Sequence, residues 1–395
     1  MRNFVVKGNI CYSGSDNALC TVENGYIVCE DKLCVGVFEN LPECYETFPC
    51  YDYADKLIIP GLIDLHVHAP QYPFRGLGLD LAAADWLDTH IFAEESKYAD
   101  LEYAEKAYTY FVSDLLTCAT TRACVWGTAH TEATLLLMQK LEDAGLKAYV
   151  GKLSTGADTA ATEQWLRDCG RFKNIKPILT TGADSLPEGL SGLRKVHDLH
   201  AQAHVFDHPD ASGLDAAHCP DIMAHCVHCS DDELAAMRRQ KVFIAHCPES
   251  NANLSLGVAP VRKYLEQGMK VGLGSDVAAG SSLSIFRAMA MAIQCSKLRW
   301  SLYDQSAAPL TMDEAFYLAT KGGGEFFGKV GSFEKGYEFD AVVIDDASHR
   351  HPQKLSVRER LERLIYLAES RNIVAKFVDA KLIREKKDCG FSCSI

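Results

Sequence analysis

Two histidines separated by one residue end a long apolar run, KLIIPGLIDLHVHA. The run predicts a strand that is buried on both faces in a parallel sheet. Residues i and i+2 of a strand share a face, so His66 and His68 can approach one metal ion from the same side. A core role is the alternative for such a pair, but its place at a strand end favours metal binding.

Two further candidate ligands lie at the ends of later apolar runs. His204 ends DLHAQAHV, and Asp276 lies near the end of KVGLGSDV. Imidazole and carboxylate ligands together suit Zn²⁺ or Fe²⁺. A metal held by these two residues and the HVH pair would lower the pKa of a bound water and make a hydroxide nucleophile. Taken singly, His204 could be a hydrogen-bonded core histidine, and Asp276 could cap the next helix.

Two more histidines end strand candidates and could move protons. His225 ends DIMAH, and His246 ends KVFIAH. A histidine near a metal-bound water can take its proton or stabilise charge on the substrate. We expect His225 to have this role and His246 to support a residue that touches the metal.

The segment HCPDIMAHCVHC, residues 218–229, offers a different metal site. It holds histidines and cysteines, including the CxxC pair Cys226 and Cys229, and structural zinc sites use such ligands. No second CxxC pair follows at the usual distance, and IMAHCVH also fits a buried strand. We therefore prefer the catalytic set.

A repeated strand-then-helix pattern positions these residues. Helical runs such as LEYAEKAYTYFVSDLLT and HTEATLLLMQKLEDAG alternate with short apolar strands, and Gly145 predicts a helix C-cap. This alternation predicts an α/β fold, a metal-dependent (β/α)8 TIM barrel over residues 59–335. The candidate ligands fall at the carboxyl ends of the strands, the face that carries chemistry in such barrels.

Both ends of the chain contain short β-rich runs instead. NFVVKGN, GYIVCEDK and CVGVFENL lie near the start, and FDAVVIDD and IVAKFVDAKLI lie near the end. They predict a small β-sandwich domain built from both termini, residues 1–58 and 336–395.

Composition narrows the class of protein. The 395 residues carry a net charge of −13, which argues against nucleic-acid or anionic-membrane partners. The 16 cysteines are scattered, as expected for reduced thiols in a cytoplasmic protein. No signal peptide is evident at the start, and no apolar run approaches the ~20 residues of a membrane span.

Several motifs together resemble the amidohydrolase superfamily, and more closely its guanine deaminase branch. They are PGLIDLHVHAPQY, DWLDTHIFAEES, MAHC, IAHCPESNANLSLGVAPV, VGLGSDVAAG and GSFEKGYEFDAVVIDD, in the family's order. The likeness extends from about residue 55 to 385.

The resemblance implies a function and a set of roles. The metal, Zn or alternatively Fe, would bind His66, His68, His204 and Asp276. His225 would be catalytic, Gln71 would contact a purine, and Trp86 would line the pocket. A metal-bound hydroxide would convert guanine to xanthine and ammonia, with no other cofactor. The family likeness also implies that the protein is a homodimer. The molecule it binds would be a small heterocyclic base.

Two departures from the family pattern concern proton transfer and recognition. The family's His-x-Ser-Glu here reads His204-Val-Phe-Asp207, so Asp207, one methylene shorter, is the candidate proton shuttle; His208 follows it. The family's Pro-Arg-Phe triplet is replaced by Thr181, Gly182 and Ala183, which removes an arginine that helps to hold the purine.

These departures keep two alternatives open. One is an aminohydrolase or chlorohydrolase that acts on another amino- or halogen-substituted heterocycle. The other is a catalytically weakened or dead relative that serves as a binding or scaffold protein.

Overall fold

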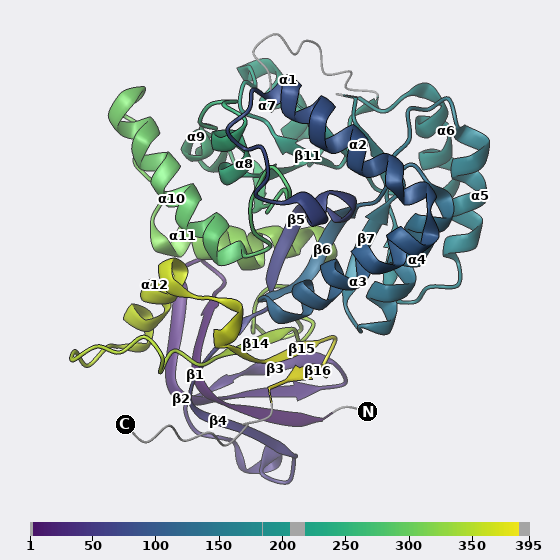
Figure 1. Ribbon diagram of the computed structural model, residues 1–395. Coiled ribbons are helices and arrows are strands. Elements are labelled where there is room, and N and C mark those ends of the chain that lie inside the picture. Colours follow the sequence, from purple (N-terminus) through teal and green to yellow (C-terminus); the bar gives the residue numbers. More distant parts are fainter. Residues whose placement is uncertain (1–2, 184, 206–217, 387–395) are drawn as a thin grey trace, which may run out of the picture.

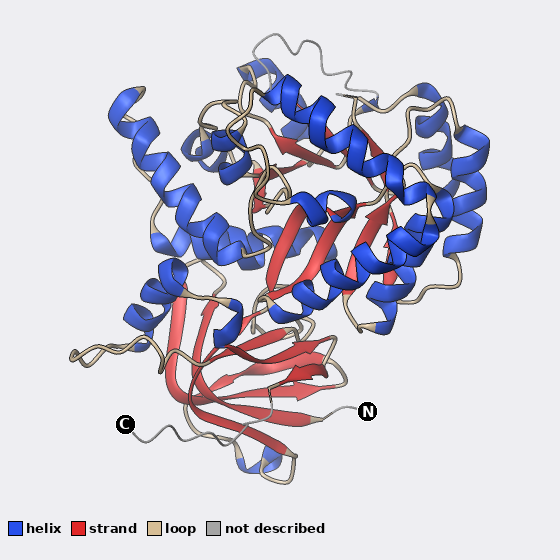
Figure 2. Ribbon diagram, viewed as in Figure 1, coloured by secondary structure: helices blue, strands red, loops and turns tan. Residues whose placement is uncertain are grey.

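The computed structural model describes residues 3–183, 185–205 and 218–386. These residues form a mixed α/β structure with three β-sheets (Figures 1 and 2). In the view of Figure 1, most helices surround the two upper sheets, and the third sheet lies below them. None of the helices in the described ranges is both long and apolar enough to cross a membrane.

Strands from both ends of the chain form the lower sheet, in the order β16-β15-β14-β4-β1-β2-β3. In chain order they are β1 (Phe4–Ser13), β2 (Leu19–Glu30), β3 (Leu33–Phe38), β4 (Cys50–Pro60), β14 (Ala341–Ile344), β15 (Ile373–Val378) and β16 (Lys381–Glu385). Strands β14 and β4 pair antiparallel, so the last part of the chain is hydrogen-bonded to the first.

The middle of the chain forms two parallel sheets, ordered β5-β6-β7-β8 and β13-β12-β11-β10-β9. Their strands are β5 (Leu62–His68), β6 (Thr120–Trp126), β7 (Lys147–Gly151), β8 (Ile175–Pro177), β9 (Leu179–Thr181), β10 (Ala201–Val205), β11 (Ile222–His225), β12 (Phe243–His246) and β13 (Lys270–Leu273). Every residue of β5 and β6 is buried, as expected for strands of a parallel sheet that is covered on both faces.

Backbone hydrogen bonds connect the two parallel sheets at both of their edges. Between β8 and β9, the amide of Ile178 donates to the carbonyl of Val150 on β7 at 3.0 Å. After β13, the amide of Asp276 donates to the carbonyl of His66 on β5 at 2.8 Å. The second bond brings residues that are far apart in the sequence to one place.

Helices follow most of these strands. They are α1 (Ala83–Trp86), α2 (Phe92–Glu95), α3 (Leu101–Thr117), α4 (Thr131–Asp143), α5 (Thr159–Cys169), α6 (Glu188–His197), α7 (Asp231–Arg239), α8 (Pro248–Asn253), α9 (Val261–Glu266), α10 (Ile285–Leu302), α11 (Met312–Tyr317) and α12 (Val357–Leu367). Asp100 caps α3 by accepting from the amide of Glu102, and Gly145 follows α4 with φ +75°. The C-cap is Ala144, one residue before the predicted Gly145, and Gly145 is the left-handed residue that follows the cap.

The interpretation of KLIIPGLIDLHVHA as one buried strand is wrong. Strand β4 ends at Pro60 in the lower sheet, and β5 begins at Leu62 in the parallel sheet. Gly61 is the single residue between the two strands. A Cβ on this residue would come within 2.0 Å of Oγ1 of Thr121. Apolarity cannot reveal this break, because the segments on both sides of it are buried.

Candidate active site

The predicted HVH pair ends β5 and is almost completely buried. His66 and His68 are 0% and 4% exposed, and their Nε2 atoms lie 3.1 Å apart. Asp64 fixes the backbone here, because its carboxylate accepts from the amide of His66 and from the amide and hydroxyl of Ser275. Asp64 therefore ties the end of β5 to the segment that carries Asp276.

The other two predicted ligands face the same point. Nε2 of His204, on β10, lies 3.1 Å from Nε2 of His66 and 3.2 Å from Nε2 of His68. Oδ1 of Asp276 lies 3.3 Å from Nε2 of each histidine of the pair. The ligand atoms of all four residues lie within 4.8 Å of one another.

The protonation states of this cluster suit a cation. Burial lowers the pKa of His66 to about 4 and that of His204 well below its ordinary value, so both imidazoles are neutral at pH 7. Burial opposes ionisation of Asp276, but the imidazoles facing it, His66 first, hold its pKa well below the usual range.

Three imidazoles that turn Nε2 atoms toward one carboxylate cannot all satisfy one another by hydrogen bonding. Nδ1 of His66 also has no hydrogen-bond partner among the described residues. Nitrogen and oxygen donors in this number match the ligand preferences of zinc and of non-haem iron. The residues present therefore fit a bound divalent metal.

His225 ends β11 and points into the same cluster. Its Nδ1 lies 2.9 Å from Oδ1 of Asn251, on α8, and its Nε2 lies 3.8 Å from Oδ2 of Asp276. An amide oxygen only accepts hydrogen bonds, so His225 donates through Nδ1 and keeps Nε2 free as a base. His225 and Asp276 have φ of +68° and +46°, a strained backbone that is common at functional sites.

Gln71 and Trp86 line the small cavity beside the cluster. Nε2 of Gln71 lies 3.2 Å from Nδ1 of His68 and 3.3 Å from Oε1 of Glu95. The indole N–H of Trp86 donates to the carbonyl of Leu77. The ring of Trp86 forms one wall of the cavity. The cavity measures about 120 Å³, and its other walls include Leu87, Ile91, Leu254 and Leu256.

The sequence interpretation missed several supporting residues, among them Asp64, Asn251 and Trp126. Trp126, the last residue of β6, stacks on His204 with ring centroids 4.3 Å apart and planes at 10°. It also packs against His66 and holds these rings in place. Its position at the carboxyl end of a strand was a signal that could have been used.

Other residues singled out in the sequence have different outcomes. Asp207 and His208 lie outside the described residues. Thr181 ends β9 and is buried, and no arginine occurs among the described residues that line the cavity. In the described ranges, the groups placed to hold a metal do not include Cys226 or Cys229. Burial lowers the pKa of His246 to about 3, so this histidine is neutral.

Comparisons with known proteins agree with this arrangement. The amidohydrolase family matches residues 57–185 and 190–383. Guanine deaminase of Dictyostelium discoideum is 33% identical over 377 residues, 84% of each chain, and that of Rattus norvegicus is 31% identical, covering 83% of each. The crystal structure of guanine deaminase from C. acetobutylicum, with guanine in its active site, is 36% identical with a TM-score of 0.90. The alignment covers 96% of this chain and 99% of that one.

The resemblance predicted from the motifs is therefore confirmed in relatives that are similar along most of their length. The chain belongs to the amidohydrolase family.

Proposed function

We propose that this chain is a metal-dependent hydrolase that converts guanine to xanthine and ammonia. The observation that carries the proposal is the convergence of three Nε2 atoms and a carboxylate at one side of a cavity of about 120 Å³. The similarity to a guanine deaminase with guanine bound supports the choice of substrate.

His66, His68, His204 and Asp276 would hold the metal, zinc or alternatively iron. When bound, the metal supplies Lewis acidity that makes water nucleophilic at neutral pH. The imidazoles contribute nitrogen donor atoms, and Asp276 contributes the compensating negative charge. Trp126 and Asp64 keep the donors in place.

His225 and Asp207 would move protons. Asn251 holds the Nδ1 proton of His225, so Nε2 can accept a proton from the attacking water and stabilise the charge that follows. We assign Asp207 to protonating the ring nitrogen and the leaving amine, the role of the family's glutamate. Gln71 would donate or accept at the purine edge, and the ring of Trp86 would cover its face.

We extend the proposal to the architecture and the assembly. Residues 59–335 would form a (β/α)8 barrel, supported by the hydrogen bonds at both edges of the parallel sheets. Residues 1–58 and 336–395 would form a small β-sandwich domain. The family resemblance supports a homodimer. The described cysteines form no disulfide, which supports a cytoplasmic location.

The absence of an arginine from the described lining favours a second candidate, deamination of another amino-substituted heterocycle. The test measures ammonia release from zinc-loaded and iron-loaded protein with guanine, 8-oxoguanine, adenine, cytosine, ammeline and a pterin. Preferred turnover of guanine supports the first proposal. Preferred turnover of another compound keeps the chemistry and changes the substrate, and no turnover by fully metal-loaded protein contradicts both.

A further inference from the structure

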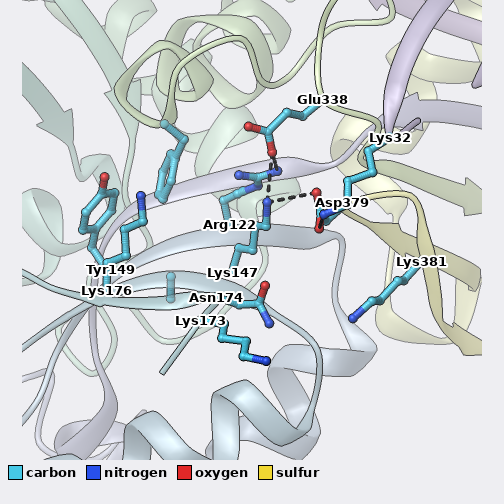
Figure 3. A pocket seen from close by; sticks show the side chains of 12 residues that line it. Lys32, Arg122, Lys147, Tyr149, Lys173, Asn174, Lys176, Glu338, Asp379 and Lys381 are labelled. Atoms are coloured by element: carbon cyan, nitrogen blue, oxygen red, sulfur yellow. Dashed lines mark hydrogen bonds and ion pairs between the residues drawn. The ribbon is translucent and has the colours of Figure 1, made fainter. Parts of the chain in front are cut away.

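A second cavity, of about 550 Å³, lies near the amino-terminal ends of β6, β7 and β8 (Figure 3). Arg122, which lines it, precedes Trp126 by four residues on β6, and a strand rises about 3.3 Å per residue. The cavity is therefore about 13 Å along the strand from the metal cluster, the name used below for His66, His68, His204 and Asp276. Its basic lining residues are Lys32, Arg122, Lys147, Lys173, Lys176 and Lys381, and its acidic ones are Glu338 and Asp379.

Three of these cations are neutralised by the protein itself. Arg122 pairs with Asp340 at 2.6 Å and with Glu338 at 2.8 Å. Lys147 lies 3.0 Å from both Glu338 and Asp379, and Lys32 lies 2.6 Å from Asp379. The dashed lines of Figure 3 mark ion pairs among the lining residues. With Asp340, which does not line the cavity, the network joins three cations and three carboxylates.

The other three lysines have no such compensation. Lys173, Lys176 and Lys381 are exposed, and none of them forms an ion pair with an acidic side chain in the described part of the chain. In Figure 3, Lys173 and Lys381 extend toward the same part of the cavity, near the amide of Asn174. The chain as a whole has a net charge of −13, so this surplus of positive charge runs against its composition.

One wall of the cavity is aromatic. Tyr149 and Phe327 line it with ring centroids 5.5 Å apart, and Figure 3 shows Tyr149 beside Lys176. Aromatic faces stack on nucleobases, while lysine ammonium groups bind phosphate oxygens by charge-assisted hydrogen bonds. The volume lies within the ~300–1,000 Å³ of small-molecule sites.

We propose that this cavity binds a small anion that contains a diphosphate group, either inorganic or esterified to a nucleoside. Lys173 and Lys381 bind its phosphates, Lys176 lies beside the aromatic wall, and the ion-pair network lines the cavity next to them. In the nucleotide form, the base lies against Tyr149 and Phe327. The site is separate from the metal cluster and does not depend on the proposed reaction.

The test is calorimetric titration of the metal-loaded protein with pyrophosphate and with ADP at low salt. The substituted protein carries Lys173→Gln, Lys176→Gln and Lys381→Gln, which leave every residue of the metal cluster in place. We expect wild type to bind at least one probe and the triple variant to bind it about tenfold more weakly or not at all, because the charge-assisted contacts are gone. Tighter binding of ADP than of pyrophosphate assigns the base to the aromatic wall; equal binding restricts recognition to the phosphates.

The matched control is Lys106→Gln, Lys297→Gln and Lys354→Gln, which removes the same charge from exposed lysines that do not line the cavity. It should bind like wild type. Metal analysis after each titration separates binding from removal of the metal by pyrophosphate. The proposal is overturned if wild type binds neither probe at millimolar concentration, or if the two triple variants bind equally well.

Discussion

Strand β6 connects two sites of opposite character. At its carboxyl end, Trp126 packs on histidines whose neutral nitrogens face one carboxylate, beside a cavity of about 120 Å³. Near its amino end, Arg122 belongs to a network of ion pairs. This network lines the same cavity as three exposed lysines. The first site presents nitrogen and oxygen atoms that can bind a cation. The second has more positive than negative side chains and fits an anion.

The two ends of β6 therefore differ in what their residues contribute, to turnover at the carboxyl end and to folding stability at the amino end. At the candidate metal ligands, the positive φ of Asp276 and an Nδ1 of His66 without a partner among the described residues fit a site kept for chemistry. The opposite end pairs the buried charges of Arg122 and Asp340 directly. Changes at the first end should therefore reduce turnover, and changes at the second should reduce the free energy of unfolding.

The largest loss of turnover is expected from Asp276→Asn. It removes the only negative charge of the four-residue cluster, so metal occupancy and ammonia release should both fall below detection. Metal analysis and a deamination assay measure these effects. Full metal content with wild-type turnover would show that Asp276 is not a ligand.

Asp207→Asn should reduce kcat by about 10²–10⁴-fold while metal content stays unchanged, because a general acid–base group contributes that much. Asp207→Glu restores the family's reach and provides the comparison. Wild-type kcat in Asp207→Asn would remove this residue from the mechanism.

At the opposite end, Arg122→Met should lower the free energy of unfolding by about 3–5 kcal/mol, because it leaves the buried carboxylate of Asp340 unpaired. Urea unfolding measures the loss, and turnover per folded molecule should not change. The double variant Arg122→Met/Asp340→Asn should recover part of the stability. A loss below about 1 kcal/mol would mean that the pair is solvated like a surface ion pair.

Lys376 should make this end sensitive to pH. Its ammonium is fully buried and donates to the carbonyls of Leu115 and Thr120, and burial lowers its pKa from 10.5 to about 8. Between these values the unfolded chain binds more protons than the folded one, so the free energy of unfolding rises with pH. Relative to Lys376→Met, wild type should gain about 2 kcal/mol between pH 8 and pH 10. Parallel pH profiles from urea unfolding would contradict this.

The smallest effect concerns a positioning residue. Asn251→Ala removes the acceptor of the Nδ1 proton of His225, and kcat should fall about tenfold with little change in KM or metal content. Asn251→Asp keeps an acceptor and should retain more activity. Equal kcat in Asn251→Ala and wild type would mean that His225 is oriented by its backbone alone.

Local patterns predicted the regular elements well. The run LEYAEKAYTYFVSDLLT forms α3, and its buried residues recur at helical spacing. The division of KLIIPGLIDLHVHA into β4 and β5 was not predictable, because it depends on the close approach of Gly61 to Thr121 in the folded chain.

The amino-acid sequence by itself determined that His66 and His68 share one face, because alternation along a strand is a local property. It also determined the residue types at the strand ends and hence the kind of metal they suit. Only the tertiary structure decided that His204 lies 3.1 Å from His66, 138 residues earlier, and that Arg122 meets Asp340, 218 residues later. Such contacts depend on strand register, in which a shift of one residue turns every side chain to the opposite face.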